Sequence, residues 1–294
     1  MLELQHVSRT FGELTALDDV SLEVRPGRMT GFIGANGAGK TTAMRIILGV
    51  IPADRGQVLW HGAPVTAADR HRFGYMPEER GLYPKMRVLE QLVFFGQLHG
   101  LQPGDAARRG TDLLTELDLG DRTQDRLEAL SLGNQQRAQV AAALIHEPEL
   151  LVLDEPFSGL DPVAADTMAA MIRQRATSGV PVLFSSHQLE LVERLCDDIV
   201  IIGGGRVLAA GPAGSLREQR AGSRYRVRLE ADAGWLRDVP DLRVLDVDGP
   251  RATVELADLE DDQLLLKRLL ERGGVHEFSR VVPTLAEIFR EAIR

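Results

Sequence analysis

The sequence has a single cysteine and no excess of positive charge, and both facts narrow the class of protein that it can encode. Cys196 is the only cysteine among 294 residues, so no intrachain disulfide is possible and a reducing, cytosolic setting fits the chain. We interpret Cys196 as a small buried hydrophobic residue. The formal net charge is -9 at pH 7, which leaves no basic field to follow a phosphate backbone. Nucleic-acid binding is therefore disfavoured.

Long apolar runs and paired histidines are missing as well. No apolar run approaches the roughly 18–20 residues that a helix needs to cross a bilayer. The first residues, Met1 to Leu4, lack the basic start and the apolar core of a signal peptide. If the protein works at a membrane, something else must hold it there. The seven histidines show no paired spacing suited to a metal, so a zinc site is not expected.

The rest of the chain is organised around the stretch from Gly34 to Thr41, which fits the phosphate-binding pattern G-x-x-x-x-G-K-[ST]. Residues 29–33 before it are typical of a short buried strand, and residues 42–48 after it predict a helix with an apolar face. Strand, loop and helix are the context that this motif requires. The sequence therefore predicts a nucleotide site here.

The residue types of this loop suit a phosphate chain. Its glycines let the backbone curl so that several N–H groups point inward, and the next helix adds a partial positive charge. Lys40 is expected to reach the β- and γ-phosphates, and the Thr41 hydroxyl to hold Mg²⁺. The loop residues that we expect to contact the nucleotide are Gly34, Asn36, Gly37, Ala38, Gly39, Lys40, Thr41 and Thr42.

A second motif ends in two carboxylates. The apolar run 150–153 predicts a strand buried on both faces, as in a parallel sheet, and Asp154 and Glu155 follow it directly. Open α/β sheets bind their ligands at the carboxyl ends of strands. Asp154 can therefore complete the Mg²⁺ site begun by Thr41, and Glu155 can orient or deprotonate an attacking water.

Three weaker signals each have an ordinary structural alternative. Phe11 could stack on a nucleotide base, but a packing phenylalanine is the simpler interpretation. Ser131 and Gly133 stand where a helix begins and could bind an anion, although a plain serine-capped helix is equally consistent. His187 follows the predicted strand 180–184 and could donate a hydrogen bond to a γ-phosphate, while a lone histidine is usually structural.

The remaining pattern predicts an α/β chain with a helical insertion and a small C-terminal α+β domain. A helical pattern covers residues 88 to about 119, interrupted at Pro103–Gly104, and the composition changes between 211 and 222. We therefore expect one large domain, residues 1–215, and an accessory domain, residues 222–294. Within the latter we expect a strand from Tyr225, a hairpin 244–256, a helix 259–270, a strand 275–282 and a capping box 284–287 before the last helix.

Taken together and in this order, these motifs resemble the ATP-binding subunit of ABC transporters, most closely bacterial export-type subunits with an extra C-terminal domain. The resemblance covers about residues 1–215. It implies a P-loop NTPase fold of the ABC type, with a helical subdomain at about 80–145 that receives a transmembrane permease. It also implies ATP and Mg²⁺ as cofactors, a second ATP-binding subunit in a homodimer, and a place at the cytoplasmic face of the membrane.

The resemblance also implies roles for single residues. Phe11 matches the aromatic residue that stacks on adenine, and Ser131 and Gly133 match the signature loop, which binds the γ-phosphate of ATP held by the second subunit. Asp161 matches the loop that crosses between subunits. The remaining matches are Lys40, Thr41 and Thr42 to the phosphate and Mg²⁺ ligands, Asp154 to the Mg²⁺-linked acid, Glu155 to the catalytic base, and His187 to the switch histidine.

Two positions depart from the family pattern. Glu78 stands where the family usually has a glutamine; its carboxylate would bind Mg²⁺ as the amide carbonyl does, but its charge would repel the γ-phosphate. The signature reads Leu-Ser-Leu-Gly-Asn instead of Leu-Ser-Gly-Gly-Gln, which changes Leu132 and Asn134 and keeps Ser131 and Gly133.

Other function classes account for less of the sequence. A soluble ABC-type ATPase acting on ribosomes or DNA would carry two ATP sites in one chain, or long coiled-coil or zinc insertions, and this acidic chain has one copy of each motif. A small-molecule kinase or a GTPase shares the phosphate loop but leaves 130–137 unexplained. We therefore interpret the chain as the ATP-hydrolysing subunit of a membrane transporter, with export as the direction that the resemblance implies.

Overall fold

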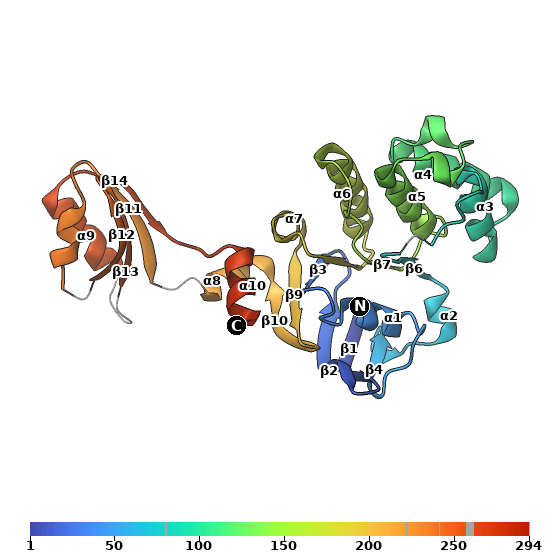
Figure 1. The fold of residues 1–294 in the computed structure, drawn as a ribbon, viewed down its shortest axis with the longest axis horizontal. Coiled ribbons are helices and arrows are strands. Elements are labelled where there is room, and N and C mark those ends of the chain that lie inside the picture. The colour runs from blue at the N-terminus through green and yellow to red at the C-terminus, as the bar shows by residue number, and fades with distance from the viewer. Residues whose placement is uncertain (80, 221–222, 241, 257–261, 294) are drawn as a thin grey trace. The chain divides into compact units, whose positions relative to one another are not determined.

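The computed structural model describes residues 1–79, 81–220, 223–240, 242–256 and 262–293. The chain separates into two compact units, residues 1–213 and residues 214–292 (Figure 1). The domain limits expected from the sequence, 1–215 and 222–294, stay a prediction.

The centre of the first unit is a six-stranded sheet in the order β10-β9-β3-β8-β7-β6. All neighbouring strands are parallel except the pair β9–β10. Strands β3, β7 and β8 are buried along their whole length, as expected for a parallel sheet covered on both faces. The carboxyl ends of the parallel strands therefore meet at one edge. The strands are β3 (Met29–Ile33), β6 (Phe73–Met76), β7 (Leu150–Leu153), β8 (Val182–Ser186), β9 (Asp198–Gly203) and β10 (Arg206–Pro212).

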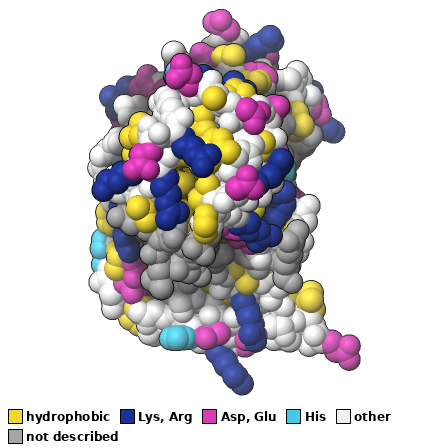
Figure 2. Space-filling model, turned by 90° about the vertical axis from the view of Figure 1, so that its left-hand side faces the viewer, with side chains coloured by type: hydrophobic (Ala, Val, Ile, Leu, Met, Phe, Trp, Pro, Cys, Tyr) yellow, Lys and Arg dark blue, Asp and Glu magenta, His cyan; other side chains and the backbone are white. Residues whose placement is uncertain are grey.

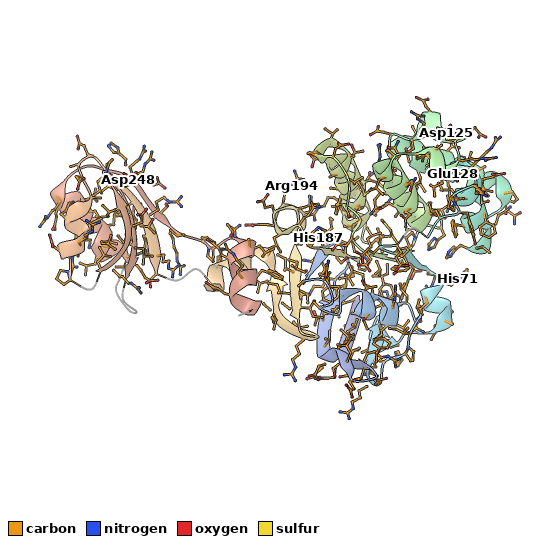
Figure 3. All side chains as sticks on the ribbon, in the orientation of Figure 1. His71, Asp125, Glu128, His187, Arg194 and Asp248 are labelled. Carbon is orange, nitrogen blue, oxygen red and sulfur yellow. The ribbon has the colours of Figure 1, made fainter. Side chains whose placement is uncertain are left out.

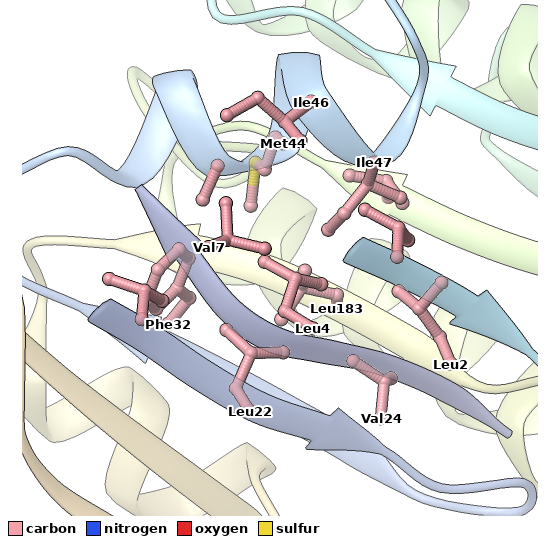
Figure 4. Close-up of a cluster of buried hydrophobic side chains, with 14 of the residues drawn as sticks. Leu2, Leu4, Val7, Leu22, Val24, Phe32, Met44, Ile46, Ile47 and Leu183 are labelled. Atoms are coloured by element: carbon pink, nitrogen blue, oxygen red, sulfur yellow. The ribbon is translucent and has the colours of Figure 1, made fainter. Parts of the chain in front are cut away.

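A second, antiparallel sheet in the order β2-β1-β4-β5 packs over helix α1 (Lys40–Ile47). Figure 4 shows Met44 and Ile47 of α1 among side chains of β1, including Leu4. The buried cluster also takes in Phe32 and Leu183 of the larger sheet. The two sheets and α1 thus share one core, which holds the loop before α1 in place. The strands are β1 (Leu2–Phe11), β2 (Leu14–Val24), β4 (Arg55–Trp60) and β5 (Ala63–Pro64).

The sequence alternates Leu2, Leu4 and His6 with Glu3, Gln5 and Val7, which predicts an opening strand, and β1 corrects that alternation. Leu2 and Leu4 are buried as expected, but the next buried residue is Val7, and His6 is exposed with a φ of +53°. The pairing of β1 with β2 shifts register between Leu4 and Val7, which is a β-bulge. A bulge inserts one residue into the strand, so the inward-facing set moves by one position after it.

The helical insertion contains α3 (Val88–Leu98), α4 (Pro103–Glu116) and α5 (Leu132–Leu144), with two short 3-10 turns, Gly120–Arg122 and Leu127–Ala129 (Figure 1). Pro103 is the first residue of α4, where the missing N–H of a proline costs no hydrogen bond within the helix. The pattern of residues 138–145 predicts a helix, and the observed helix α5 begins six residues before Ala138, at Leu132. A serine at position 131 caps it, so the polar stretch 132–137 is its first part.

Three histidines far apart in sequence stack at the base of this insertion. His71 follows α2 (Ala67–Arg70), His99 follows α3 and His146 follows α5. Ring centres are 4.7 Å apart for His71 and His99, and 3.7 Å apart for His99 and His146. Burial, and secondly the neighbouring His99, lowers the pKa of His146 to about 4. His146 is therefore uncharged at neutral pH and packs as an aromatic ring.

Two helices, α6 (Pro162–Thr177) and α7 (Leu189–Leu195), follow β7 and β8 along the chain. The residue after α7 is Cys196, which is buried as expected. A side chain at Gly31 of β3 would come within 2.6 Å of its sulfur atom. Burial raises the pKa of the Cys196 thiol, so the thiolate form is disfavoured.

The second unit is a four-stranded antiparallel sheet in the order β12-β13-β11-β14, with the apolar side of α9 in its core. The hairpin expected at 244–256 is confirmed, and so is the capping box: Thr284 N–H donates to Glu287 (2.8 Å) and Glu287 N–H donates to Thr284 Oγ1 (3.3 Å). The elements are α8 (Ala213–Arg220), β11 (Arg224–Leu229), a 3-10 turn (Gly234–Asp238), β12 (Leu242–Asp248), β13 (Arg251–Leu256), α9 (Asp262–Arg272), β14 (Val275–Arg280) and α10 (Leu285–Ile293).

Three expectations from the sequence concern this part of the chain. The stretch 211–222, interpreted as a change of composition, contains the helix α8 at its centre. The strand expected to run to Val282 ends at Arg280, and positions 259–261 of the expected helix lie outside the described residues.

Figure 2 shows apolar side chains beside charged side chains of both signs on the face that it presents.

Candidate nucleotide site

The loop between β3 and α1 has the shape that its glycines allow. Gly37 and Gly39 have φ values of +79° and +110°, in the region that favours glycine. A Cβ atom at Gly39 would also lie 2.6 Å from the Ala16 carbonyl oxygen. Lys40 is buried, and its Nζ donates to the carbonyl oxygens of Gly34 (2.7 Å) and Ala35 (3.3 Å). The lysine thus curls back over the loop that precedes it.

Asp154 connects this loop to the centre of the sheet. The Thr41 hydroxyl donates to Asp154 Oδ2 (2.7 Å), and the Ser185 hydroxyl donates to Asp154 Oδ1 (2.5 Å). The Asp154 side chain is fully buried, so both oxygens need these partners. Hydroxyl and carboxylate oxygens are the ligands that Mg²⁺ prefers, so the donor set fits that ion. Ser185 had no role in the sequence prediction; its signal was a hydroxyl at the carboxyl end of β8.

Glu155 is held in a strained conformation. Its φ is +52°, in the left-handed region that a residue with a side chain rarely occupies. Four hydrogen bonds fix it. Its N–H donates to Ser185 Oγ (2.8 Å), and its carboxylate pairs with His187 Nδ1 (2.9 Å). Its carbonyl accepts from Gln136 Nε2 (2.9 Å) and from the Ser158 N–H (3.1 Å). Strain of this kind costs on the order of 1–3 kcal/mol and persists only where the surroundings determine it.

The pair of Glu155 and His187 joins a buried acid to an exposed base. The Glu155 side chain is 7% exposed and that of His187 is 56% exposed. Figure 3 labels His187, which follows β8 at the carboxyl-end edge of the sheet. A carboxylate so placed can accept a proton from a water and is oriented by the imidazole. The structure therefore brings together the residues that the sequence placed at strand ends.

The signature loop forms a separate cluster. Ser131 is exposed and caps α5, its Oγ accepting from the Asn134 N–H (3.3 Å). The segment 158–161 lies beside it: a side chain at Gly133 would come within 3.2 Å of Leu160, and one at Gly159 within 3.0 Å of Leu132. Asp161 caps α6, its Oδ1 accepting from the Ala164 N–H (2.9 Å). Leu132, one of the two departures from the family signature, lies beside Gly159 and is 48% exposed.

Helix α5 also touches the site at two points that the sequence prediction missed. Gln136 donates to the Glu155 carbonyl, and Gln139 Nε2 donates to the carbonyls of Pro77 (3.4 Å) and Glu79 (3.2 Å). The side chain of Glu78, between them, is exposed. One helix thereby fixes both Glu155 and the segment after β6. The signal in the sequence was two glutamines three positions apart, which lie on the same face of a helix.

A curated relative matches this chain from end to end. The uncharacterized ABC transporter ATP-binding protein YhaQ of Bacillus subtilis is 36% identical over 100% of this chain and 98% of its own length. This chain belongs to the ABC transporter ATP-binding proteins. The Nod factor export ATP-binding protein I of Cupriavidus metallidurans is 35% identical over 76% of this ABC subunit and 74% of its own length.

Families and solved structures agree with that membership. The ABC transporter family matches residues 17–158, and the C-terminal domain of ATP-binding proteins like DrrA1-3 matches residues 211–293. A solved ATP-binding subunit of an ABC transporter superimposes with a TM-score of 0.69 at 33% identity, over 74% of this chain and 92% of that one. The P-loop NTPase fold of the ABC type is thereby confirmed.

As an ABC subunit, the protein binds and hydrolyses ATP and powers transport across a membrane. Subunits of this family work with a transmembrane partner. Across the described residues, no helix is both long enough and apolar enough to span a bilayer. The alternative of a soluble ATPase acting on ribosomes or DNA is not supported, because the relatives are transporter subunits.

Proposed function

We propose that this ABC subunit powers export, as a homodimer held at the cytoplasmic face of the membrane by a separate permease. A relative whose name states export, Nod factor export ATP-binding protein I, supports the direction. The observation that carries the catalytic part is the buried pair of Asp154 and Glu155, hydrogen-bonded to Thr41 on one side and His187 on the other. These bonds join the phosphate loop to an acid–base pair.

In this proposal the ATP phosphates lie in the loop before α1. Lys40 would exchange its two carbonyl partners for the β- and γ-phosphate oxygens, and the backbone N–H groups of the loop would face the phosphate chain. Phe11, at the end of β1 and 43% exposed, would stack on the adenine. The remaining contacts would come from Gly34, Asn36, Gly37, Ala38, Gly39, Thr41 and Thr42.

Thr41 and Asp154 would hold Mg²⁺, with Glu78 as a further oxygen donor. When bound, the ion supplies charge neutralisation at the phosphates. Ser185 keeps Asp154 oriented, since it occupies the second carboxylate oxygen. Glu78 is exposed in the structure and adds a negative charge at this edge of the sheet.

Glu155 would orient the attacking water and accept its proton, and His187 would hydrogen-bond the γ-phosphate. The signature cluster completes the site from a second copy of the chain: Ser131 and Gly133 lie at the N-terminus of α5, which favours an anion, and Ser131 is exposed. Asp161 lies in the segment packed on that cluster and would cross between subunits with it. Two ATP molecules would thus join two chains.

Glu78→Gln is expected to change the Mg²⁺ dependence of ATP hydrolysis. Removing the charge weakens the attraction for the ion and relieves the repulsion of the γ-phosphate, so half-maximal activity shifts to a higher Mg²⁺ concentration. Steady-state ATPase rates over a Mg²⁺ titration measure this shift, with Glu79→Gln, the exposed neighbour, as the matched control. Superimposable titrations for Glu78→Gln and the native protein would remove Glu78 from the metal site.

The function as a whole is tested by recovering the partner. Tagged Glu155→Gln protein is added with ATP to detergent-solubilised native membranes and purified, with untagged protein as the control. Stoichiometric recovery of a polytopic membrane protein is the expected result, and the identity of that protein would indicate the transported substrate class. Recovery of ribosomal or DNA-bound proteins, with nothing from the membrane, would refute the proposal.

A further inference from the structure

An arginine lies on the ring of Phe11. Arg9 and Phe11 are two residues apart on β1, and their side chains meet. The guanidinium carbon of Arg9 is 4.7 Å from the centre of the Phe11 ring, within the range of a cation–π interaction. The Arg9 side chain is only 21% exposed, whereas Phe11 is 43% exposed. The arginine therefore lies beneath a ring that remains open to a ligand.

Arg9 is itself held by Asp54. Its Nη1 donates to Asp54 Oδ1 at 2.6 Å, and the other carboxylate oxygen accepts the Thr10 N–H at 2.7 Å. The Asp54 N–H donates to the Ser8 carbonyl (2.9 Å), which fastens the turn before β4 to the end of β1. The Thr10 N–H bond, and then the Arg9 bond, lower the pKa of Asp54, so the carboxylate stays charged. The guanidinium is thus fixed against the strand.

The Nε–H group of Arg9 is a second sign that the guanidinium is held by the ring. It is buried and makes no hydrogen bond to any of the residues that the structure describes. A buried donor without an acceptor is uncommon and calls for an explanation. The electron-rich face of the Phe11 ring is the group that the guanidinium meets, and it offsets part of this cost.

Phe11 needs such support because of where it lies. It is the last residue of β1, directly before Gly12, whose φ of +59° belongs to the hairpin turn. A phenylalanine has no hydroxyl with which to anchor its ring. A ring that is packed on a fixed guanidinium, and is still 43% exposed, loses little further rotational freedom when a flat base stacks on it.

We propose that Arg9, fixed by Asp54, is a positioning residue that holds the Phe11 ring for stacking on the adenine of ATP. The inference rests on the role proposed above for Phe11. Arg9 contributes to the affinity for the base and acts through the ring, without touching the phosphates. The interaction recognises the adenine part of the nucleotide, so the affinity for a ligand without a base does not depend on Arg9.

A double-mutant cycle tests this on the full-length protein. Calorimetry gives the Kd of ADP, which is not hydrolysed, and of inorganic pyrophosphate as the probe without a base, for the native protein, Arg9→Ala, Phe11→Ala and the double variant. We expect Arg9→Ala to weaken ADP binding about two- to fivefold and Phe11→Ala about five- to a hundredfold. Pyrophosphate binding is expected to stay unchanged, and the double variant to match Phe11→Ala.

Two further variants guard against a disturbed hairpin. Asp54→Asn keeps the shape of the side chain but loosens Arg9, and is expected to weaken ADP binding in the same sense. Arg25→Ala alters an exposed arginine directly after β2 and is expected to have no effect. The inference would be overturned if the double variant weakened ADP binding by the product of the two single-variant factors. It would also be overturned if Arg9→Ala weakened pyrophosphate binding as much as ADP binding. Unchanged ADP binding by Phe11→Ala would overturn the proposed role of Phe11 as well.

Discussion

Replacing Glu155 with glutamine is expected to lower ATP turnover by at least about a hundredfold while ATP binding is retained. The amide cannot accept the proton of the attacking water, but it keeps the size of the side chain and a hydrogen bond to His187. Because ATP then persists in the site, the variant is expected to accumulate as a dimer. Steady-state ATPase rates and the mass of the particle by light scattering, with and without ATP, measure both effects.

A matched control separates this effect from a general change of charge. Glu190→Gln alters an exposed glutamate in the first turn of α7, three residues after His187, and is expected to hydrolyse ATP at the native rate. Hydrolysis at the native rate by Glu155→Gln would show that this carboxylate is not the base. A variant that stays monomeric at saturating ATP would instead contradict the two-chain site.

Lys40→Ala is expected to weaken ATP binding about ten- to a hundredfold, because one charged group with two or three hydrogen bonds to the phosphates is lost. In the structure, Lys40 Nζ donates to the Gly34 and Ala35 carbonyl oxygens, so its amino group already lies at the start of the phosphate loop. Calorimetric titration with ATP measures the loss. Lys267→Ala, which alters an exposed lysine on α9, serves as the control and is expected to bind as the native protein does.

The fold of the Lys40→Ala variant must be checked as well, because Lys40 is buried and bonded to the loop. Circular dichroism and the unfolding temperature show whether the variant is native, and native values with lost binding would support the direct role. Native affinity in a folded Lys40→Ala protein would exclude the loop before α1 as the phosphate site.

Sequence alone determined the features that depend on residues a few positions apart. The phosphate loop is one: eight residues contain the glycines, the lysine and the threonine that the site requires, and the structure shows the positive φ values that only glycine adopts readily. The capping box at Thr284 and the hairpin across Asp248–Gly249 are local in the same way. Such patterns predict structure reliably because residues a few positions apart are in contact independently of the tertiary structure.

Local patterns failed where a partner strand or helix altered the outcome. The alternation 2-4-6 in the first strand broke at His6, because the pairing with β2 and β4 places a bulge there. The start of α5 was predicted too late, because 132–137 is polar and its burial depends on packing against the loops around it. In both cases tertiary packing overrode the local pattern.

Only the tertiary structure decided which of the candidate residues meet. Thr41 and Asp154 are 113 residues apart in sequence, and His187 lies 32 residues from Glu155, yet each pair is hydrogen-bonded. The order of strands in the sheet brings these ends together, and no residue pattern within one strand encodes that order. Ser185, Gln136 and the three stacked histidines were not assigned for the same reason: each acquires its role from a partner on another element.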